Sequence, residues 1–133
     1  MKYWIYVFAA GISLLLYACN SVRRIRMENK SGEDAEITWI INQDSINQSK
    51  LFYSNSDTVR FHLQQKRPYN RVKMSFGVGK WTPKELSKFV DDLSTLEIKW
   101  KGGTIKLDSS QIFEYLVVRR RGIDNSQIKI ELK

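Results

Sequence analysis

Two arginines separated by a single residue are the sharpest candidate for binding chemistry in this chain. Arg119 and Arg121 flank Arg120, and the alternation of side chains along an extended backbone places the outer two on one face. Two guanidinium groups on one face can hold a phosphate or a carboxylate through paired hydrogen bonds. The other interpretation is an edge strand whose charges protect it from aggregation. The sequence leaves both open and favours the protected edge.

Trp81 is the second candidate binding residue, because an exposed indole ring can act as a platform for a sugar. It directly precedes Thr82-Pro83-Lys84-Glu85, a capping box with proline at the first helical position. An apolar residue before a helix cap also fits a hydrophobic staple, in which Trp81 would pack against Leu86. We expect the packing role ahead of the sugar-binding role.

No group of residues in the sequence indicates catalysis. His62 is the only histidine, and it alternates with Phe61 and Leu63, which predicts a solvent-facing position on a strand. Asp91 and Asp92 are adjacent on a predicted helix, where neighbouring side chains point about 100° apart, so they do not converge on one ion. The sequence therefore predicts no catalytic residue, no metal site, no cofactor and no enzymatic activity.

Cys19 is the only cysteine, and it closes an apolar segment. Lys2 supplies a positive charge, residues 3–16 are apolar apart from Ser13, and the small residue Ala18 precedes the cysteine. A charged start, a short apolar core and a small residue before the cut are typical of a secretory signal peptide. An uncleaved membrane helix is the alternative, but residues 3–19 are at the short limit of the roughly 17–25 residues that span a bilayer.

Leu16, Ala18 and Cys19 resemble the lipobox of bacterial lipoproteins, from which Tyr17 departs. The resemblance implies that residues 1–18 are removed and that Cys19 is lipidated and becomes the mature N-terminus. Two or three acyl chains hold a small protein at a membrane almost permanently, since each buried methylene contributes about 0.8 kcal/mol. Residues 19–26 would then be the lipidated cysteine and a short tether, and residues 27–133 one β-rich domain.

The residue after the lipidated cysteine carries sorting information in Gram-negative lipoproteins, where aspartate commonly marks retention at the inner membrane. Asn20 stands at that position here. The resemblance therefore implies the outer membrane, with the domain facing the periplasm. Arg23 and Arg24 occupy the region where an acidic cluster directs some lipoproteins to the cell surface.

The charge balance limits the choice of partner. The 133 residues carry a net charge of +8, and loss of residues 1–18 with Lys2 leaves 115 residues at +7, enough for one domain. A basic exported domain suits nucleic acid, an anionic membrane surface or acidic glycans, and a lipid anchor argues against nucleic acid. A solvated basic surface without a ligand is an equally good interpretation.

The periodicity of apolar residues predicts a mainly β fold. We expect a single antiparallel β-sandwich, or a curled sheet, with one amphipathic α-helix over about 83–94 and a short helical turn from Asp108 to Phe113. Trp39, Trp100 and the helical stripe that includes Phe89 are expected in the core. Predicted strands contain residues 25–27, 37–41, 51–53, 59–63, 72–78, 96–100, 105–107, 115–121 and 127–132.

Two tripeptides, Asp44-Ser45-Ile46 and Asp57-Thr58-Val59, resemble sites at which some Gram-negative bacteria O-glycosylate exported proteins. The first lies in a polar segment and is the better of the two.

The sequence as a whole predicts an exported lipoprotein that acts as a binding or accessory module of the cell envelope. Its partners would be the membrane, through Cys19, and either a protein or an anionic envelope component. Arg119, Arg121 and Trp81 are the candidate ligand-binding residues. The alternative is an enzyme acting on envelope glycans, or an inhibitor of one.

Overall fold

The computed structural model describes residues 21–45, 56–122 and 124–133. Within these ranges it has eight strands, two α-helices and one 3₁₀-helix. The strands are β1 (Val22–Asn29), β2 (Ala35–Ile41), β3 (Thr58–Leu63), β4 (Arg71–Val78), β5 (Leu93–Trp100), β6 (Gly103–Asp108), β7 (Arg120–Arg121) and β8 (Gln127–Leu132). The helices are η1 (Gln43–Ser45), α2 (Pro83–Asp91) and α3 (Ser109–Val117).

The strands form two four-stranded sheets, which confirms the mainly β prediction. Sheet A has the order β4-β1-β8-β7, and sheet B has the order β3-β2-β5-β6. Every described pairing in the two sheets is antiparallel except that of β1 with β8, which is parallel. The chain alternates between the sheets: β1 lies in sheet A, β2 and β3 in sheet B, β4 in sheet A, β5 and β6 in sheet B, and β7 and β8 in sheet A.

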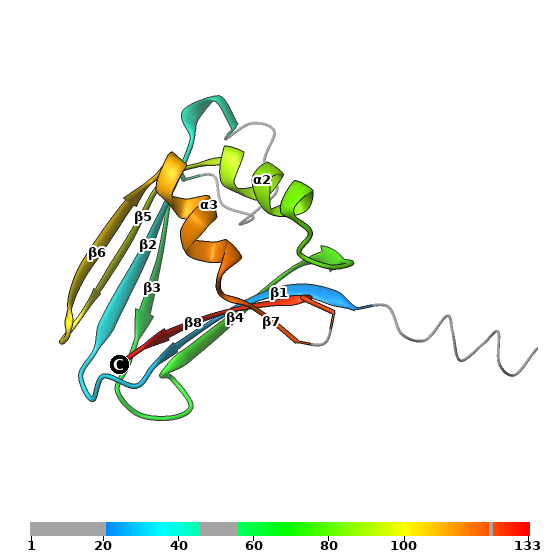
Figure 1. Ribbon diagram of the computed structural model, residues 1–133. Helices are drawn as coiled ribbons and strands as arrows, with labels where there is room; N and C mark the ends of the chain where they lie inside the picture. The colour runs from blue at the N-terminus through cyan, green and yellow to red at the C-terminus, as the bar shows by residue number, and fades with distance from the viewer. Residues whose placement is uncertain (1–20, 46–55, 123) are drawn as a thin grey trace, which may run out of the picture.

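The two sheets converge near the C-terminus and diverge toward the opposite end, where α2 and α3 lie in the space between them (Figure 1). The inward-facing side chains of both sheets form one core with the helices. Its fully buried members include Ile25, Met27, Ile37, Trp39 and Ile98, each with 0% of its surface exposed. The molecule is therefore an open sandwich whose wide end is filled by helices.

Helix α2 forms where its capping box predicted it. The Thr82 hydroxyl accepts a hydrogen bond from the backbone N–H of Glu85 at 3.2 Å. Leu86, Phe89 and Val90 are the buried side of the helix. The helix ends at Asp91, three residues before the predicted end, because Leu93 is already the first residue of β5 and is fully buried.

Helix α3 corrects the prediction for residues 109–121. Asp108 and Gln111 form a full capping box, and the helix continues to Val117 instead of stopping near Phe113. The strand predicted over residues 115–121 is therefore wrong in its first half. Ile112 and Leu116, one helical turn apart, are both fully buried, and this burial outweighs the β propensity of the segment.

Strand β1 begins at Val22, inside the segment predicted as a tether. Residues 22–26 are paired with β4 on one side and, from Arg24 on, with β8 on the other. The reason is that the alternation of inward and outward side chains starts before residue 27, where the sequence suggested that the domain begins. Ile25 and Met27 are buried, while Arg24 and Arg26 face out.

A buried asparagine ties the converging ends of the sheets together. The Asn29 side chain donates to the backbone oxygens of Glu33 at 2.6 Å and Leu63 at 3.1 Å, and its own oxygen accepts from the N–H of Ser31 at 3.0 Å. The side chain of Asn70, also buried, donates to the backbone oxygen of Asn29 at 3.1 Å. These bonds satisfy backbone groups that the sheets leave unpaired at this end.

Four aromatic rings join the diverging ends. Phe89 of α2 makes edge-to-face contacts with Trp39 of sheet B, Phe76 of sheet A and Trp81, with ring centroids 5.8, 5.1 and 5.4 Å apart. Phe76 and Trp81 are in contact at 5.6 Å. Such pairs are worth about 0.5–1.5 kcal/mol beyond the area that they bury. Phe89 is therefore the common contact of both sheets and the loop before α2.

Of the two tryptophans expected in the core, Trp39 is fully buried, whereas Trp100 is half-buried at the margin. The Trp100 Nε1 donates to the backbone oxygen of Lys133 at 2.9 Å and holds the segment after β8 against β5. In the ranges that the structure describes, neither helix has the length and apolar character needed to cross a bilayer.

Phe89→Ala is expected to lower the free energy of unfolding by about 3–5 kcal/mol, the usual cost of truncating a buried phenylalanine. Urea unfolding of the purified protein, followed by tryptophan fluorescence, measures the change. Ser87→Ala alters an exposed position on the same helix and is the control, with an expected change within about 0.5 kcal/mol. A Phe89→Ala midpoint close to the wild-type value would show that α2 is peripheral to the core.

Candidate functional site

Arg119 and Arg121 line the same open pocket, although they come from different elements. Arg119 follows the α3 C-cap residue Val118, and Arg121 is in β7. The pocket has a volume of about 490 Å³, and its remaining lining residues are Val118, Lys129, Glu131 and Lys133. We call this site the basic pocket. The structure thus brings the two predicted arginines together without the single strand that was expected to carry them.

Backbone carbonyl groups hold both guanidinium groups in place. The Arg119 guanidinium lies 3.4 Å from the centroid of the Tyr115 ring, and its Nη1 donates to the Tyr115 oxygen at 2.5 Å. The Arg121 Nη1 donates to the oxygens of Val118 at 3.0 Å and Arg120 at 2.9 Å. These bonds engage one nitrogen of each guanidinium, which carries five N–H donors, so both groups are positioned without being saturated.

Arg120 serves the fold instead of the pocket. It pairs with Ile128 of β8, and its Nη1 donates to the backbone oxygen of Trp81 at 3.2 Å. Its Nε donates to the oxygen of Val117 at 3.1 Å. Arg120 therefore fastens the loop before α2 to the end of α3. β7 is the edge strand of sheet A, so its charges also fit the protected-edge interpretation.

Sequence reasoning missed the two lysines of the pocket. Lys129 and Lys133 are four residues apart along the direction of β8, and strand geometry places both on the same side as Glu131. Their even spacing was visible in the sequence. What could not be seen is that β8 pairs with β7 and so brings these lysines beside Arg121.

Glu131 is the one acidic residue that lines the pocket. Its carboxylate pairs with Lys129 at 2.7 Å, with Lys30 at 3.0 Å and with Lys133 at 3.6 Å. The hydrogen bonds from Lys129 and Lys30 lower its pKa from 4.5 to about 2. Glu131 therefore stays ionised at any physiological pH, and the four basic residues around the pocket outnumber it.

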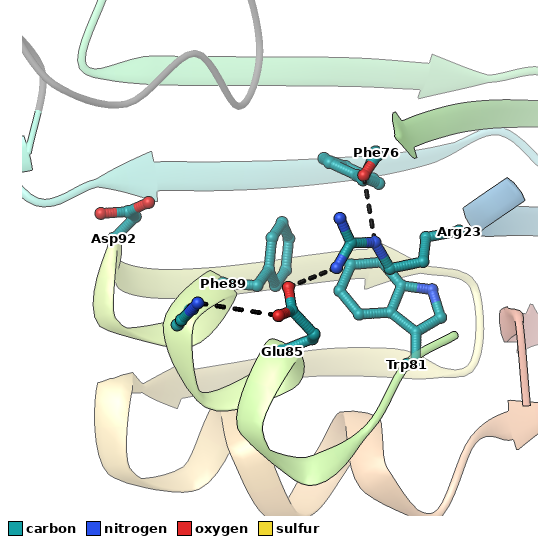
Figure 2. Close-up of a pocket in the computed structure, with 7 residues that line it drawn as sticks. Arg23, Phe76, Trp81, Glu85, Phe89 and Asp92 are labelled. Atoms are coloured by element: carbon teal, nitrogen blue, oxygen red, sulfur yellow. Dashed lines mark hydrogen bonds and ion pairs between the residues drawn. The ribbon is translucent and has the colours of Figure 1, made fainter. Parts of the chain in front are cut away.

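Trp81 lies in the core, which agrees with the packing role, while the expected contact with Leu86 stays a prediction. Only 2% of its surface is exposed, and its Nε1 donates to the backbone oxygen of Arg24 at 3.1 Å. Its ring contacts Phe76 and Phe89, with the Arg23 guanidinium 5.8 Å from the ring centroid (Figure 2). Sugar stacking needs an open ring face, so this environment favours packing.

A second, smaller hollow of about 140 Å³ lies beside Trp81, lined also by Arg23, Glu85, Lys88 and Asp92. Figure 2 shows that the Arg23 guanidinium reaches Glu85 across this hollow and donates to the Phe76 oxygen, at 3.2 Å. The bond from Arg23 lowers the pKa of Glu85. The charges that line the hollow thus neutralise each other.

The other candidate residues do not assemble into a site. His62 is exposed, as predicted, and its Nε2 lies 3.3 Å from an Asp34 carboxylate oxygen. Asp91 and Asp92 are the last residue and the C-cap of α2. Among the described residues, no group of three or more His, Cys, Asp or Glu side chains could hold a metal ion. Cys19 lies outside the described residues.

The two glycosylation candidates are placed only in part. Asp44 and Ser45 belong to the 3₁₀-helix η1, and Ile46 lies outside the described residues. Thr58 is the first residue of β3, and its hydroxyl donates to the Asp57 carboxylate at 3.0 Å. Both tripeptides stay predictions.

No protein-family model matches the chain, and no curated protein matches it significantly. Among solved structures, the chain is similar to Lip of Serratia marcescens, described as a membrane-bound component of the type VI secretion system. The identity is 9%, the TM-score is 0.29, and the match covers 84% of this chain and 89% of that one. A likeness of this size establishes neither a shared fold nor a shared role.

The thermal midpoint of the protein is expected to fall as the pH decreases from about 4.5 to about 2. A carboxylate with a lowered pKa stabilises the fold above its unfolded-state value of 4.5, and this contribution is lost as Glu131 is protonated. Glu131→Gln should reduce the fall in this window. Asp124, whose pKa the hydroxyls of Ser21 and Ser126 also lower to about 2, should maintain part of the remainder. Glu85, Glu97 and Asp108 should maintain the rest, since hydrogen bonds lower their pKa values too.

Glu114→Gln neutralises an exposed side chain on α3 and is the matched control, which should keep the wild-type profile. Midpoints measured by circular dichroism across the pH range decide the question. An equally steep fall in Glu131→Gln would show that the contacts of Glu131 with Lys129 and Lys30 do not stabilise the fold.

Proposed function

We propose that this protein is an exported lipoprotein that acylated Cys19 anchors in a membrane of the cell envelope, and that its domain binds an anionic envelope component in the basic pocket. The observation that carries the binding role is the convergence of four basic side chains on one pocket from two stretches of the chain, residues 119–121 and 129–133. The lipobox resemblance around Cys19 supports the anchor.

The chemistry of the pocket favours a phosphate over a neutral ligand. Arg119 and Arg121 present planar groups that can bind two oxygens of a phosphate at once, whereas Lys129 and Lys133 supply compact positive charges. The volume of about 490 Å³ is in the range of small-ligand sites, and the pocket is open to solvent. A phosphorylated headgroup or glycan substituent therefore fits the pocket by both charge and size.

We further propose the outer membrane as the site of anchoring, with the domain on the periplasmic side. Asn20 after the lipidated cysteine supports this placement. The anchor also supports an envelope ligand over nucleic acid. A protein partner on the same surface belongs to the same proposal, because exposed charges like those of the basic pocket also steer protein association.

We propose a binding role and no catalytic one. His62 pairs with Asp34, but the two side chains are 62% and 53% exposed. A catalytic histidine needs an orienting partner and a nucleophile within reach, in surroundings that exclude water. The exposed pair supports the solvated surface position that the alternation around His62 predicted. No observation favours the alternative of an enzyme or an inhibitor acting on glycans.

Cys19→Ser is expected to abolish acylation and to leave an uncleaved precursor, because the thiol is the group that carries the lipid. Incorporation of radiolabelled palmitate and the size of the product measure both effects. Tyr17→Val changes the one position that departs from the lipobox and is the control, which should be processed at least as well as wild type. Normal cleavage and palmitate labelling of Cys19→Ser would refute the lipoprotein assignment.

Arg119→Glu combined with Arg121→Glu is expected to weaken binding of inorganic pyrophosphate by about tenfold or more, because each charge-assisted hydrogen bond contributes about 1.5–3 kcal/mol. Calorimetric titration of the detergent-solubilised full chain measures it. Arg60→Glu combined with Lys106→Glu makes the same change in net charge on sheet B and should bind like wild type. Equal weakening by both pairs would show a general charge effect with no pocket.

A further inference from the structure

The outer face of sheet A is more basic than the rest of the described strands. Since one side of this sheet is buried in the core, alternate residues of β1, β4, β8 and β7 must face outward. Two of the outward residues are acidic, Glu28 and Glu131. Six are basic, and we call them the basic face: Arg24, Arg26, Arg71, Lys73, Arg121 and Lys129.

Strand register places like charges next to one another on this face. Arg26 lies directly opposite Lys73 of β4 and directly beside Lys129 of β8. Like charges opposite each other in a sheet are destabilising. Glu28 offsets part of the repulsion by pairing with Arg26 at 3.2 Å and Lys129 at 3.9 Å, but only 3% of Glu28 is exposed. What solvent meets on this face is therefore mainly positive charge, with the partly exposed Glu131 as the acidic exception.

The outer face of sheet B has a different balance of charges from the outer face of sheet A. Besides His62, this face of sheet B carries three basic residues and three acidic ones: Arg60, Lys99, Lys106, Glu36, Glu97 and Asp108. Opposite charges also meet there, as in the Lys99–Glu97 pair at 2.6 Å. A basic surface is thus no general consequence of the composition, because the two outer faces differ within one domain.

The basic face adjoins the end of the chain that would carry the anchor. Two residues separate Cys19 from Val22, so at most about 11 Å of extended chain joins the cysteine to the start of β1. The row of outward residues nearest that start holds Arg24 and Arg121, the next holds Lys73, Arg26 and Lys129, and the acidic residues Glu28 and Glu131 come only in the third.

We infer that the basic face is a docking surface for the anionic phospholipid surface of the membrane in which the anchor is inserted, so that the domain lies with sheet A against the bilayer. This inference rests on the proposed lipid anchor and deepens the proposed pocket. Arg121 and Lys129 belong to both, so the pocket opens at one edge of the face and would take up a lipid phosphate.

Electrostatic attraction to a membrane surface acts over a short range, and the length of the tether is similar to this range. The Debye length at physiological salt is about 8 Å, and a basic residue within that range strengthens adsorption by about fivefold. A flat sheet face can bring several such residues within range at once. A tether of this length keeps them close to the surface, so docking is a change of orientation with little translational cost.

Labelling of single introduced cysteines tests the orientation. Ser75→Cys lies on β4 among the basic residues, and Thr104→Cys lies on β6 on the outer face of sheet B; both positions are exposed and both strands are at sheet edges. Because Cys19 is acylated in the anchored protein, the introduced thiol is the one that reacts. The full chain is reconstituted in vesicles of phosphatidylcholine, with or without an equal part of phosphatidylglycerol, and treated with a maleimide that does not enter lipid.

The expected result is at least tenfold slower labelling of Ser75→Cys in the anionic vesicles than in the neutral ones, with Thr104→Cys unchanged. About 0.5 M salt should restore the rate without releasing the protein, because screening affects the face and not the anchor. Adding Arg71→Glu and Lys73→Glu should shift the balance toward the undocked state by at least about 30-fold, the effect of losing two basic residues alone. Arg60→Glu with Lys106→Glu makes the same charge change on sheet B and should have no effect.

The outcomes separate this inference from the proposed function. If the protein floats with neutral vesicles in a density gradient, but Ser75→Cys reacts equally fast in neutral and anionic vesicles, the anchor stands and the docking surface is refuted. If wild-type protein fails to float with any vesicle, the anchor itself fails. Protection of Ser75→Cys in native envelopes alone would overturn the inference in favour of a protein partner.

Discussion

The parallel pairing of β1 with β8 is the interaction on which the rest of the structure depends. It places β1 inside sheet A, where Ile25 and Met27 are buried and the residues between them must face outward. It also sets the first and last described strands side by side, with Arg24 beside Gln127 and Arg26 beside Lys129. Basic residues that are more than a hundred positions apart in the sequence thus come to share one surface.

Two different kinds of contact hold the sheets together at their two ends. At the converging end, the buried side chain of Asn29 satisfies the carbonyl groups of the adjoining turns through hydrogen bonds. At the diverging end, Phe89 and Trp81 fill the space with aromatic contacts. The hydrogen bonds of Asn29 have a fixed direction, and the ring contacts of Phe89 and Trp81 bury apolar area. Together they fix the angle between the two sheets at both ends.

The proposed anchor and the proposed binding surfaces would complement each other. Acyl chains on Cys19 would supply affinity for a membrane without any specificity, and the domain would then need only weak, oriented contacts. The basic pocket and the basic face share Arg121 and Lys129, and both suit phosphate groups. With the proposed anchor in place, weak electrostatic contacts would suffice because the anchor would keep the effective concentration high.

Local signals in the sequence determined most of the described strands, the core position of Trp39 and the start of α2, because alternation and capping act within a few residues. The strand expected over residues 51–53 lies outside the described residues and stays a prediction. Arg119 and Arg121 line one pocket, but the strand face from which the sequence predicted this does not include Arg119. The length of α3 was decided by tertiary structure, since burial of Ile112 and Leu116 overrides local propensity. Tertiary structure also placed Lys129 and Lys133 in the pocket and assembled the basic face, because long-range strand pairing leaves no local pattern in a sequence.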